Sequence, residues 1–299
     1  MHSLQTVGVL AHPFRPATFP LAEEIAAGLR ERGLNCWVRT GEAAEQIHDL
    51  APETDLVVAI GGDGAMLRAA RLCAPHSVPV LGVNVGRLGF LTEVRSPNRW
   101  PQALDAVLAG RYWIEERMMV GYEARRGDQC LCAGDALNDV VIGRGELATT
   151  VWLETYIDRG WTTTYAADAL IIATATGSTA YALAVGGPIL PPELRNILIV
   201  PVAPHLTMDR PIVVSEGAVI DVFVAPENRT GVIVSADGVL ATTLQVGDRV
   251  TVQASAHVSR FVRLRGRNYF YRSLLDRLEP RHPSRQRPRH TGFMENDEN

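Results

Sequence analysis

The first third of the chain alternates short apolar runs, typical of buried strands, with helical patterns. Residues 6–10, 35–38, 56–60 and 78–83 have the strand pattern, and a helical pattern at residues 21–32 ends at a glycine. Strands that alternate with helices predict a parallel sheet that is covered on both faces. Ligands of such sheets bind beyond the carboxyl ends of the strands, so the residues that follow each strand are the first candidates for a functional site.

The pattern changes to a period of two in the second half of the chain, where Gly, Asn, Pro and Asp separate short apolar runs. One helical island interrupts this pattern at residues 179–184. The predicted fold class is therefore an α/β N-terminal domain with a Rossmann-like parallel sheet and a mostly β C-terminal domain. A helix at residues 100–108 is expected to connect the two domains.

These patterns divide the chain into four expected parts. The α/β domain covers residues 1–98, and the β-rich domain covers residues 99–265. A closing segment at residues 266–279 is expected to pack back on the N-terminal domain. Residues 280–299 mix Pro, Arg, His and acidic residues without apolar periodicity, which predicts a disordered tail.

The basic residues restrict the possible chemistry, because all 29 of them are arginine and the chain contains no lysine. A lysine-dependent P-loop, a Schiff-base mechanism and the strand lysine of protein kinases are therefore excluded. Any bound phosphate must be held by backbone amides, arginine or metal.

The overall charge and hydropathy exclude several classes of partner. A net charge of −4 gives no reason to expect nucleic acid or an anionic membrane. No apolar run is long enough to span a bilayer, and the first residues lack the basic and apolar regions of a signal peptide. We therefore expect a cytoplasmic protein.

A Gly-Gly-Asp-Gly motif at residues 61–64 stands directly behind the third strand and in front of a helical pattern. Backbone amides at such a helix start bind phosphate. The side chain of Asp63 would repel phosphate unless its partner is a metal or a substrate hydroxyl. Taken alone, a plain strand-to-helix turn with Asp63 as the helix cap explains these residues equally well.

Three further segments add to this motif. Residues 82–92 form a glycine-rich loop after the fourth strand, at the same sheet edge. Asn138 and Asp139 interrupt an apolar run, where a β-bulge or turn is the alternative to a site. Residues 168–181 lead from a buried strand into a hydroxyl-rich turn and a helix start suited to an anion, where Tyr181 either stacks on a base or belongs to the core.

With these segments the chain resembles the NAD kinase family. Gly-Gly-Asp-Gly is shared with diacylglycerol and sphingosine kinases, whereas Thr-Gly-Ser-Thr-Ala-Tyr is far more specific. Ala65, Ala175 and Val239 depart from the residues usual in the family, which concerns fine substrate contacts rather than the reaction. The matching stretches follow the family's order over roughly residues 5–275 and are 61–64, 84–91, 138–139, 176–181, 186–188 and 201–205.

The resemblance implies a kinase that transfers a phosphoryl group from ATP or inorganic polyphosphate to the 2′-hydroxyl of the adenosine ribose of NAD, making NADP. It assigns catalysis to Asp63. Because aspartate is a weak base, Asp63 is expected to orient the hydroxyl and to take its proton late. Positioning and charge neutralisation would supply most of the acceleration, with Mg²⁺ as the expected divalent metal and no metal ligand assigned.

The resemblance also implies that the domain at residues 99–265 binds the dinucleotide. Asp168 would accept a hydrogen bond from the nicotinamide amide or its ribose. The site would draw on two subunits, so a homodimer or homotetramer is expected. The implied phosphate-donor loop is Gly61, Gly62, Asn84, Gly86 and Gly89, and the implied NAD-binding residues are Asp63, Gly64, Arg68, Asn138, Asp139, Asp168, Thr176, Thr179, Ala180, Tyr181, Ala182, Leu183, Ala184 and Ala203.

Two other functions stay open at this point. A lipid kinase would share Asp63 but would need an apolar acceptor cleft or a basic membrane-binding face. A non-catalytic NADP-binding module would keep Asn138, Asp139 and Tyr181 but would need no acidic group at Asp63. An NAD-dependent oxidoreductase is excluded, because the first strand is not followed by a Gly-x-Gly-x-x-Gly turn.

Overall fold

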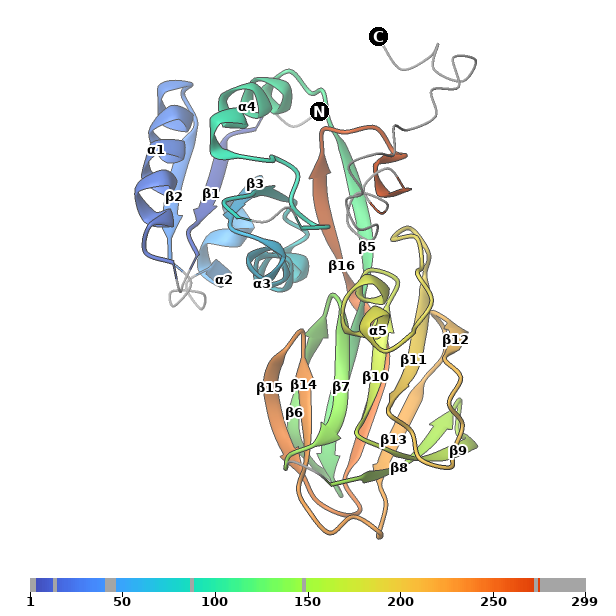
Figure 1. Ribbon diagram of the computed structural model, residues 1–299. Coiled ribbons are helices and arrows are strands. Elements are labelled where there is room, and N and C mark those ends of the chain that lie inside the picture. Colours follow the sequence, from blue (N-terminus) through green and yellow to red (C-terminus); the bar gives the residue numbers. More distant parts are fainter. Residues whose placement is uncertain are drawn as a thin grey trace, which may run out of the picture. The chain divides into compact units, whose positions relative to one another are not determined.

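The computed structural model describes residues 4–12, 15–40, 47–86, 89–146, 149–271 and 274 (Figure 1). The chain falls into two compact units, one that ends at Arg265 and one that starts at Gly266. In the second unit a helical turn begins at Tyr269. Half of the expected closing segment and the whole expected tail lie outside the described residues, so the packing of that segment stays a prediction.

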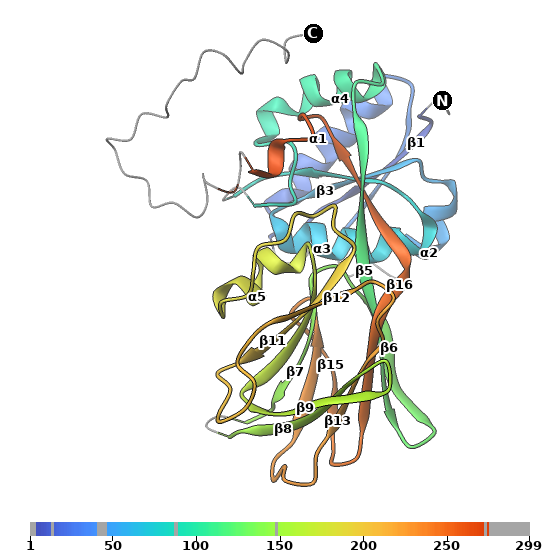
Figure 2. The same cartoon turned by 90° about the vertical axis from the view of Figure 1, so that its right-hand side faces the viewer.

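The N-terminal part forms the predicted parallel sheet with helices on both faces. Two helices pack on one face around Ile25 and Leu104, and two pack on the other around Met66 (Figure 2). The strand order is β2-β1-β3-β4. The elements are β1 (Thr6–Leu10), β2 (Asn35–Arg39), β3 (Leu56–Ile60) and β4 (Val80–Val83), with α1 (Thr18–Glu31) and α4 (Trp100–Leu108) on the first face, α2 (Ile47–Leu50) and α3 (Asp63–Cys73) on the second, and the 3-10 turns η2 (Ala51–Glu53), η3 (Ala74–His76) and η4 (Pro97–Arg99).

The C-terminal part is built from long antiparallel strands, as the period of two predicts. A six-stranded sheet has the order β12-β11-β10-β7-β14-β15, and the remaining strands belong to a ten-stranded sheet. The elements are β5 (Trp113–Arg126), β6 (Gln129–Ala136), β7 (Asp139–Arg144), β8 (Val151–Ile157), β9 (Gly160–Ala167), β10 (Ala169–Thr174), η5 (Gly177–Thr179), α5 (Tyr181–Ala184), β11 (Asn196–Val202), β12 (Ile212–Ser215), β13 (Ile220–Val224), β14 (Val232–Ala236), β15 (Val239–Leu244) and β16 (Arg249–Arg263).

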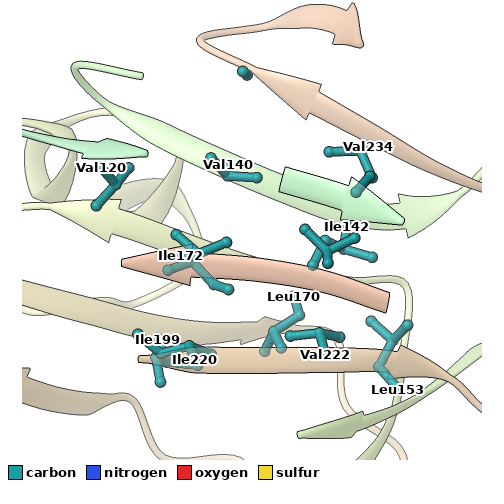
Figure 3. Packing of buried hydrophobic residues seen from close by; sticks show 14 of the residues in the cluster. Val120, Val140, Ile142, Leu153, Leu170, Ile172, Ile199, Ile220, Val222 and Val234 are labelled. Carbon is teal, nitrogen blue, oxygen red and sulfur yellow. The ribbon is translucent and has the colours of Figure 1, made fainter. Parts of the chain in front are cut away.

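The two sheets enclose the main core of the C-terminal part (Figure 3). Every second residue of each strand points into it, so that Val140 and Ile142 of β7 face Val120 of β5 and Val222 of β13 across the layer. Burial of these β-branched side chains supplies most of the driving force for folding of this part, at about 25 cal/mol per Å² of apolar surface. The predicted fold class is confirmed.

The ten-stranded sheet runs through both parts of the chain, because β16 belongs to both. Near its end β16 pairs in parallel with β4, at Phe261 and Val80, and along most of its length it pairs antiparallel with β5 and β13. The sequence patterns did not predict this shared strand. The domain boundary expected at residue 98 stays a prediction.

The helical island expected at residues 179–184 is present as two short elements. Only Tyr181–Ala184 is α-helical, after the single 3-10 turn η5. Binding of an anion at this helix start stays a prediction. No described helix has the length and apolarity of a membrane span.

Candidate functional site

Asp63 is held by the loop that follows the neighbouring strand. It is the first residue of α3, and its side chain does not cap that helix. Instead Oδ2 accepts the N–H of Phe90 at 2.8 Å and Oδ1 accepts the N–H of Leu91 at 2.9 Å. The capping interpretation of Asp63 is therefore wrong, and the two glycine-bearing segments meet at one sheet edge as predicted.

Gly89 allows this approach. A Cβ atom at Gly89 would lie 1.9 Å from Oδ1 of Asp63, a distance that real Cβ atoms do not show. The glycine is thus required by the carboxylate that packs on it, in addition to any contact with a donor phosphate.

Asn84 shapes the rest of the predicted phosphate-donor loop. Its buried side chain donates from Nδ2 to the carbonyl of Gly86 at 2.8 Å and accepts the N–H of Gly86 at 3.3 Å. Arg87 and Leu88 of the family-like motif lie outside the described residues. A contact of this loop with a donor phosphate stays a prediction, as it does for Gly61 and Gly62.

Basic side chains gather at the same edge of the sheet. Burial lowers the pKa of His12, and the positive charges of Arg15 and Arg68 lower it further. Carbon Cδ2 of His12 lies 3.1 Å from where a Cβ on Gly61 would be, and Nη1 of Arg15 lies 3.4 Å from where one on Gly86 would be. The sequence predicted Arg68 but missed His12 and Arg15, although both follow the first strand at the edge where ligands of parallel sheets bind.

Asn138 lies in the tight turn between β6 and β7, and Asp139 is the first residue of β7. The side chain of Asp237, which is fully buried, holds this turn. The carboxylate of Asp237 accepts the N–H groups of Leu137 at 3.1 Å, Asn138 at 2.7 Å and Asp139 at 3.4 Å. The turn interpretation of the Asn-Asp pair is therefore correct, and it does not compete with a role in binding.

Asp237 was not predicted as a site residue. It occupies the two-residue turn Asp237-Gly238 between β14 and β15, where both φ angles are positive. Such an Asp-Gly pair is a common hairpin signal, so nothing in the local sequence indicates a second role. Nε of Arg71, on α3, lies 3.8 Å from Oδ2 of Asp237 and connects the turn to the helix that begins with Asp63.

Asp139 is a buried acid next to a second buried acid. Burial raises the pKa of Asp139 to about 7, and the negative charge of Asp237 contributes to the increase. A carboxyl group with such a pKa presents both a hydrogen-bond donor and acceptors near neutral pH.

The segment Thr174–Gly177 packs on the Asn138 turn. The N–H of Thr174 donates to the carbonyl of Asn138 at 2.8 Å. A Cβ atom at Gly177 would lie 2.0 Å from the same carbonyl oxygen, so the two backbones are in direct contact. Thr176, the residue before Gly177, is buried in this contact region. Two of the predicted NAD-binding segments are thereby brought together.

The following residues divide into exposed and buried positions. Tyr181 and Ala184 are exposed, and Thr179, Ala180 and Leu183 are half-buried. Ala182 belongs to a core cluster with Ile171 and Leu198, so its side chain faces the protein. Any NAD contact at Ala182 would come from its backbone.

Asp168 and Ala203 lie at the other end of the same sheet. Asp168 precedes β10, whereas Thr176 follows it, and at about 3.3 Å per residue the two ends are about 20 Å apart. Asp168 forms an ion pair with Arg144 at 3.0 Å, and its N–H donates to Val202, the residue before Ala203. One chain therefore does not bring all the predicted NAD-binding residues together.

No group of three or more His, Cys, Asp or Glu side chains in the described part of the chain is arranged to hold a metal ion. Mg²⁺ commonly binds through one or two carboxylates and the phosphates of a substrate. Asp63 beside the glycine turns fits that kind of site, since each of its oxygens accepts one backbone N–H and keeps a lone pair.

Two family models match the chain, the ATP-NAD kinase N-terminal domain over residues 23–112 and the ATP-NAD kinase C-terminal domain over residues 137–264. The NAD kinase of Chloroflexus aurantiacus is 41% identical over 275 residues, which cover 92% of this chain and 99% of that protein. The NAD kinase of Heliobacterium modesticaldum is 37% identical over 283 residues, with the same coverage of 92% and 99%.

Two solved structures share the fold. The yeast NADH kinase complexed with NADH superimposes with a TM-score of 0.81 at 25% identity, over 93% of this chain and 88% of that one. An NAD kinase from Archaeoglobus fulgidus in complex with ATP superimposes with a TM-score of 0.70 at 24% identity, over 90% of this chain and 97% of that one. This second likeness shows a common fold alone. The identity and coverage of the curated relatives exclude the lipid-kinase alternative, and the chain belongs to the NAD kinase family.

Proposed function

We propose that this member of the NAD kinase family transfers the terminal phosphoryl group of ATP to the 2′-hydroxyl of the adenosine ribose of NAD, with Asp63 as the group that receives the hydroxyl proton. The observation that carries the proposal is the position of Asp63. Its carboxylate is fixed by two main-chain N–H groups, at a sheet edge where three basic side chains gather. A fixed carboxylate orients the acceptor hydroxyl, and the positive charges of Arg15 and Arg68 attract the donor phosphates.

Orientation is the larger part of what Asp63 contributes. Its oxygens keep lone pairs for the ribose hydroxyl after accepting the N–H groups of Phe90 and Leu91. The bond between the 2′-oxygen and the terminal phosphorus forms while the bond from that phosphorus to the leaving ADP oxygen breaks. The hydroxyl proton passes to Asp63 late in this step, as in phosphoryl transfer generally.

The donor phosphates lie over the glycine turns in this proposal. Arg15 and Arg68 supply positive charge there, and His12 supplies a neutral imidazole at pH 7 because its pKa is lowered. The two arginines replace the lysine that the chain does not contain. Mg²⁺ held by the donor phosphates and Asp63 would neutralise part of the phosphate charge.

The dinucleotide lies against the second group of residues. Asn138 and Asp139 bind it from a turn that Asp237 fixes, and Thr176 borders the adenosine side. Tyr181, which is exposed, offers a face for stacking on adenine. Asp168 is about 20 Å from this group along β10, so we assign its contact with the nicotinamide end to the site of a second copy of the chain. The proposed assembly is therefore a homodimer or homotetramer, and the proposed location is the cytoplasm.

Formation of NADP tests the reaction. Purified protein is incubated with NAD, Mg²⁺ and either ATP or inorganic polyphosphate, and the product is measured by chromatography. The phosphate position is read by NMR. We expect NADP with ATP as the donor. Failure to form NADP with either donor rejects the proposed function.

A second measurement tests the assembly. The mass in solution is measured by light scattering, and Asp168→Ala is mixed with an inactive Asp63→Asn chain. If sites draw on two subunits, mixed oligomers contain sites that have an intact Asp63 and an intact Asp168, so activity rises on mixing. A monomeric, fully active enzyme rejects the shared site.

A further inference from the structure

Three buried charged side chains lie on one face of the long strand pair β5 and β16. Glu115 and Arg117 come from β5 and Arg263 comes from β16, with exposed fractions of 7%, 3% and 0%. Glu116, which stands between Glu115 and Arg117, is exposed. We call Glu115, Arg117 and Arg263 the buried charge bridge.

One end of the bridge reaches the loop that holds Asp63. Nη1 of Arg263 donates to the carbonyl of Leu91 at 2.8 Å. The N–H of the same Leu91 donates to Oδ1 of Asp63 at 2.9 Å. Arg263 therefore fixes the residue that in turn fixes the Asp63 carboxylate.

The other end reaches the dinucleotide segment. Arg263 donates from Nε to Oε2 of Glu115 at 2.7 Å, and Arg117 donates from Nε to the same oxygen at 3.0 Å. Nη1 of Arg117 then donates to Oγ1 of Thr176 at 3.2 Å. An unbroken series of hydrogen bonds thus joins Asp63 to Thr176 through the interior of the protein.

The bridge is a costly way to stabilise a sheet. Taking three charges out of water opposes folding, and buried ion pairs are often no more stabilising than apolar residues of the same volume. Both guanidinium groups lie over the ring of Phe261, with Cζ of Arg263 5.1 Å and Cζ of Arg117 5.7 Å from the ring centroid, which offsets part of that cost. What the charges provide beyond apolar packing is direction, because a planar guanidinium fixes the angle and distance of each partner.

We infer that Arg117, Glu115 and Arg263 are positioning residues that set the placement of Asp63 relative to the dinucleotide segment at Thr176. The inference rests on the proposed function for the roles of Asp63 and Thr176. Catalysis depends steeply on such placement, since a displacement of about 1 Å costs about a hundredfold in rate. The two ends of the bridge act on different steps, with Arg263 acting on the chemical step and Arg117 on NAD binding.

Arginine-to-lysine variants at the two ends test this division. Lysine keeps the charge but loses the planar fork that reaches two partners. For Arg263→Lys we expect kcat to fall by about tenfold to a hundredfold with little change in the KM for NAD. For Arg117→Lys we expect the KM and the calorimetric Kd for NAD to rise by about tenfold, with a smaller change in kcat.

A surface ion pair on the same two strands is the matched control. Arg260 of β16 and Glu116 of β5 are paired in register, and their side chains meet at 3.1 Å on the exposed face. Arg260→Lys and Glu116→Gln are expected to leave kcat, KM and Kd unchanged. If the controls move these values as much as the bridge variants do, the inference is rejected.

A third variant, at Thr176, tests the inference even if the variants of the buried arginines do not fold. Thr176→Val removes the hydroxyl that accepts from Arg117 and keeps the shape of the side chain, whereas Thr176→Ser keeps the hydroxyl. We expect Thr176→Val to weaken NAD binding and Thr176→Ser to leave it unchanged. In a chain that already carries Arg117→Lys, we expect Thr176→Val to have no further effect. Additive effects of Thr176→Val and Arg117→Lys reject the link between them.

The outcomes separate this inference from the proposed function. An active wild type, an inactive Asp63→Asn and bridge variants with wild-type kcat, KM and Kd would leave the proposed function standing and reject the positioning roles. Bridge variants that lower only the melting temperature, assayed well below it, lead to the same rejection. If no NADP forms at all, the calorimetric Kd still tests the Arg117 end.

Discussion

Two carboxylates in this protein do the same structural work in different surroundings. Asp63 accepts N–H groups from Phe90 and Leu91, and Asp237 accepts N–H groups from the turn at Leu137 to Asp139. Each thereby fixes a loop that belongs to another strand. Asp63 is half-buried, whereas the side chain of Asp237 is fully buried.

The difference shows what a backbone-anchored carboxylate needs in order to react. Exposure leaves the remaining lone pairs of Asp63 open to a substrate hydroxyl, while those of Asp237 are enclosed by protein. The same anchoring therefore yields a candidate catalytic group in one place and a support for the predicted NAD-binding residues Asn138 and Asp139 in the other. Four variants test this comparison, in order of decreasing expected effect.

Asp63→Asn should abolish most of the activity. The amide cannot receive the hydroxyl proton, and its NH₂ group opposes one of the two N–H donors, so we expect kcat to fall by about 10² to 10⁴-fold. Steady-state kinetics with NAD and ATP measure the change. The control is Asp55→Asn, since Oδ2 of the exposed Asp55 also accepts two backbone N–H groups, from Gln5 and Thr6. Full activity of Asp63→Asn would remove Asp63 from catalysis.

Gly89→Ala should act through Asp63 without touching the carboxylate itself. The new methyl group would overlap Oδ1 of Asp63, so the loop and the carboxylate must separate. We expect kcat to fall by about a hundredfold, as for a displacement of about 1 Å, with a smaller change in the KM for NAD. Gly28→Ala in α1 is the control, because its nearest neighbour is 3.9 Å away and alanine there should raise stability slightly. Normal turnover of Gly89→Ala contradicts the close approach.

Asp237→Asn should weaken NAD binding more than it slows the chemical step. It removes one acceptor from a buried turn, at a cost of about 1–3 kcal/mol, and loosens Asn138 and Asp139. We expect the calorimetric Kd for NAD to rise by about tenfold and the melting temperature to fall. An increase in Kd no larger than that of Asp55→Asn would show that the turn holds its shape without Asp237.

Asp139→Asn should change how stability depends on pH. The pKa of Asp139 is about 7 in the folded protein and ordinary in the unfolded chain, so between about pH 4 and 7 only the folded form keeps the proton. The contribution of Asp139 to the unfolding free energy therefore falls as pH rises through this window and is level above it. Thermal unfolding is measured from pH 4 to pH 8. The unfolding free energy of the variant, relative to that of the wild type, should rise by at least about 1 kcal/mol over this range. A constant difference at all pH values would contradict the raised pKa.

The sequence patterns predicted the elements whose partners are close along the chain. The strands of the parallel sheet, the helix at Trp100–Leu108 and the β-rich second half follow from local periodicity, and the structure has them all. The Gly-Gly-Asp-Gly and Asn-Asp motifs were also identified, because glycines and polar residues beside buried strands are conspicuous. These signals are local, and so is the structure they predict.

The residues that were missed have partners far away in sequence. Glu115 and Arg117 stand in a run of charges that is typical of a solvated strand face, and only the pairing of β5 with β16 shows that every second one is buried. Asp237 resembles an ordinary hairpin residue, and its three N–H donors are about a hundred positions away. Periodicity carries no information about such contacts.

The shared strand β16 has a consequence for the order in which the protein is made. The parallel sheet places β4 next to β16, which is the last strand of its unit, so β4 keeps an open edge until the chain has been translated beyond Phe261. Arg263, which fixes the loop above Asp63, is synthesised just after it. Nascent and truncated chains therefore expose a strand edge to chaperones and proteases, and the proposed phosphoryl-transfer site is completed only when β16 and Arg263 have left the ribosome.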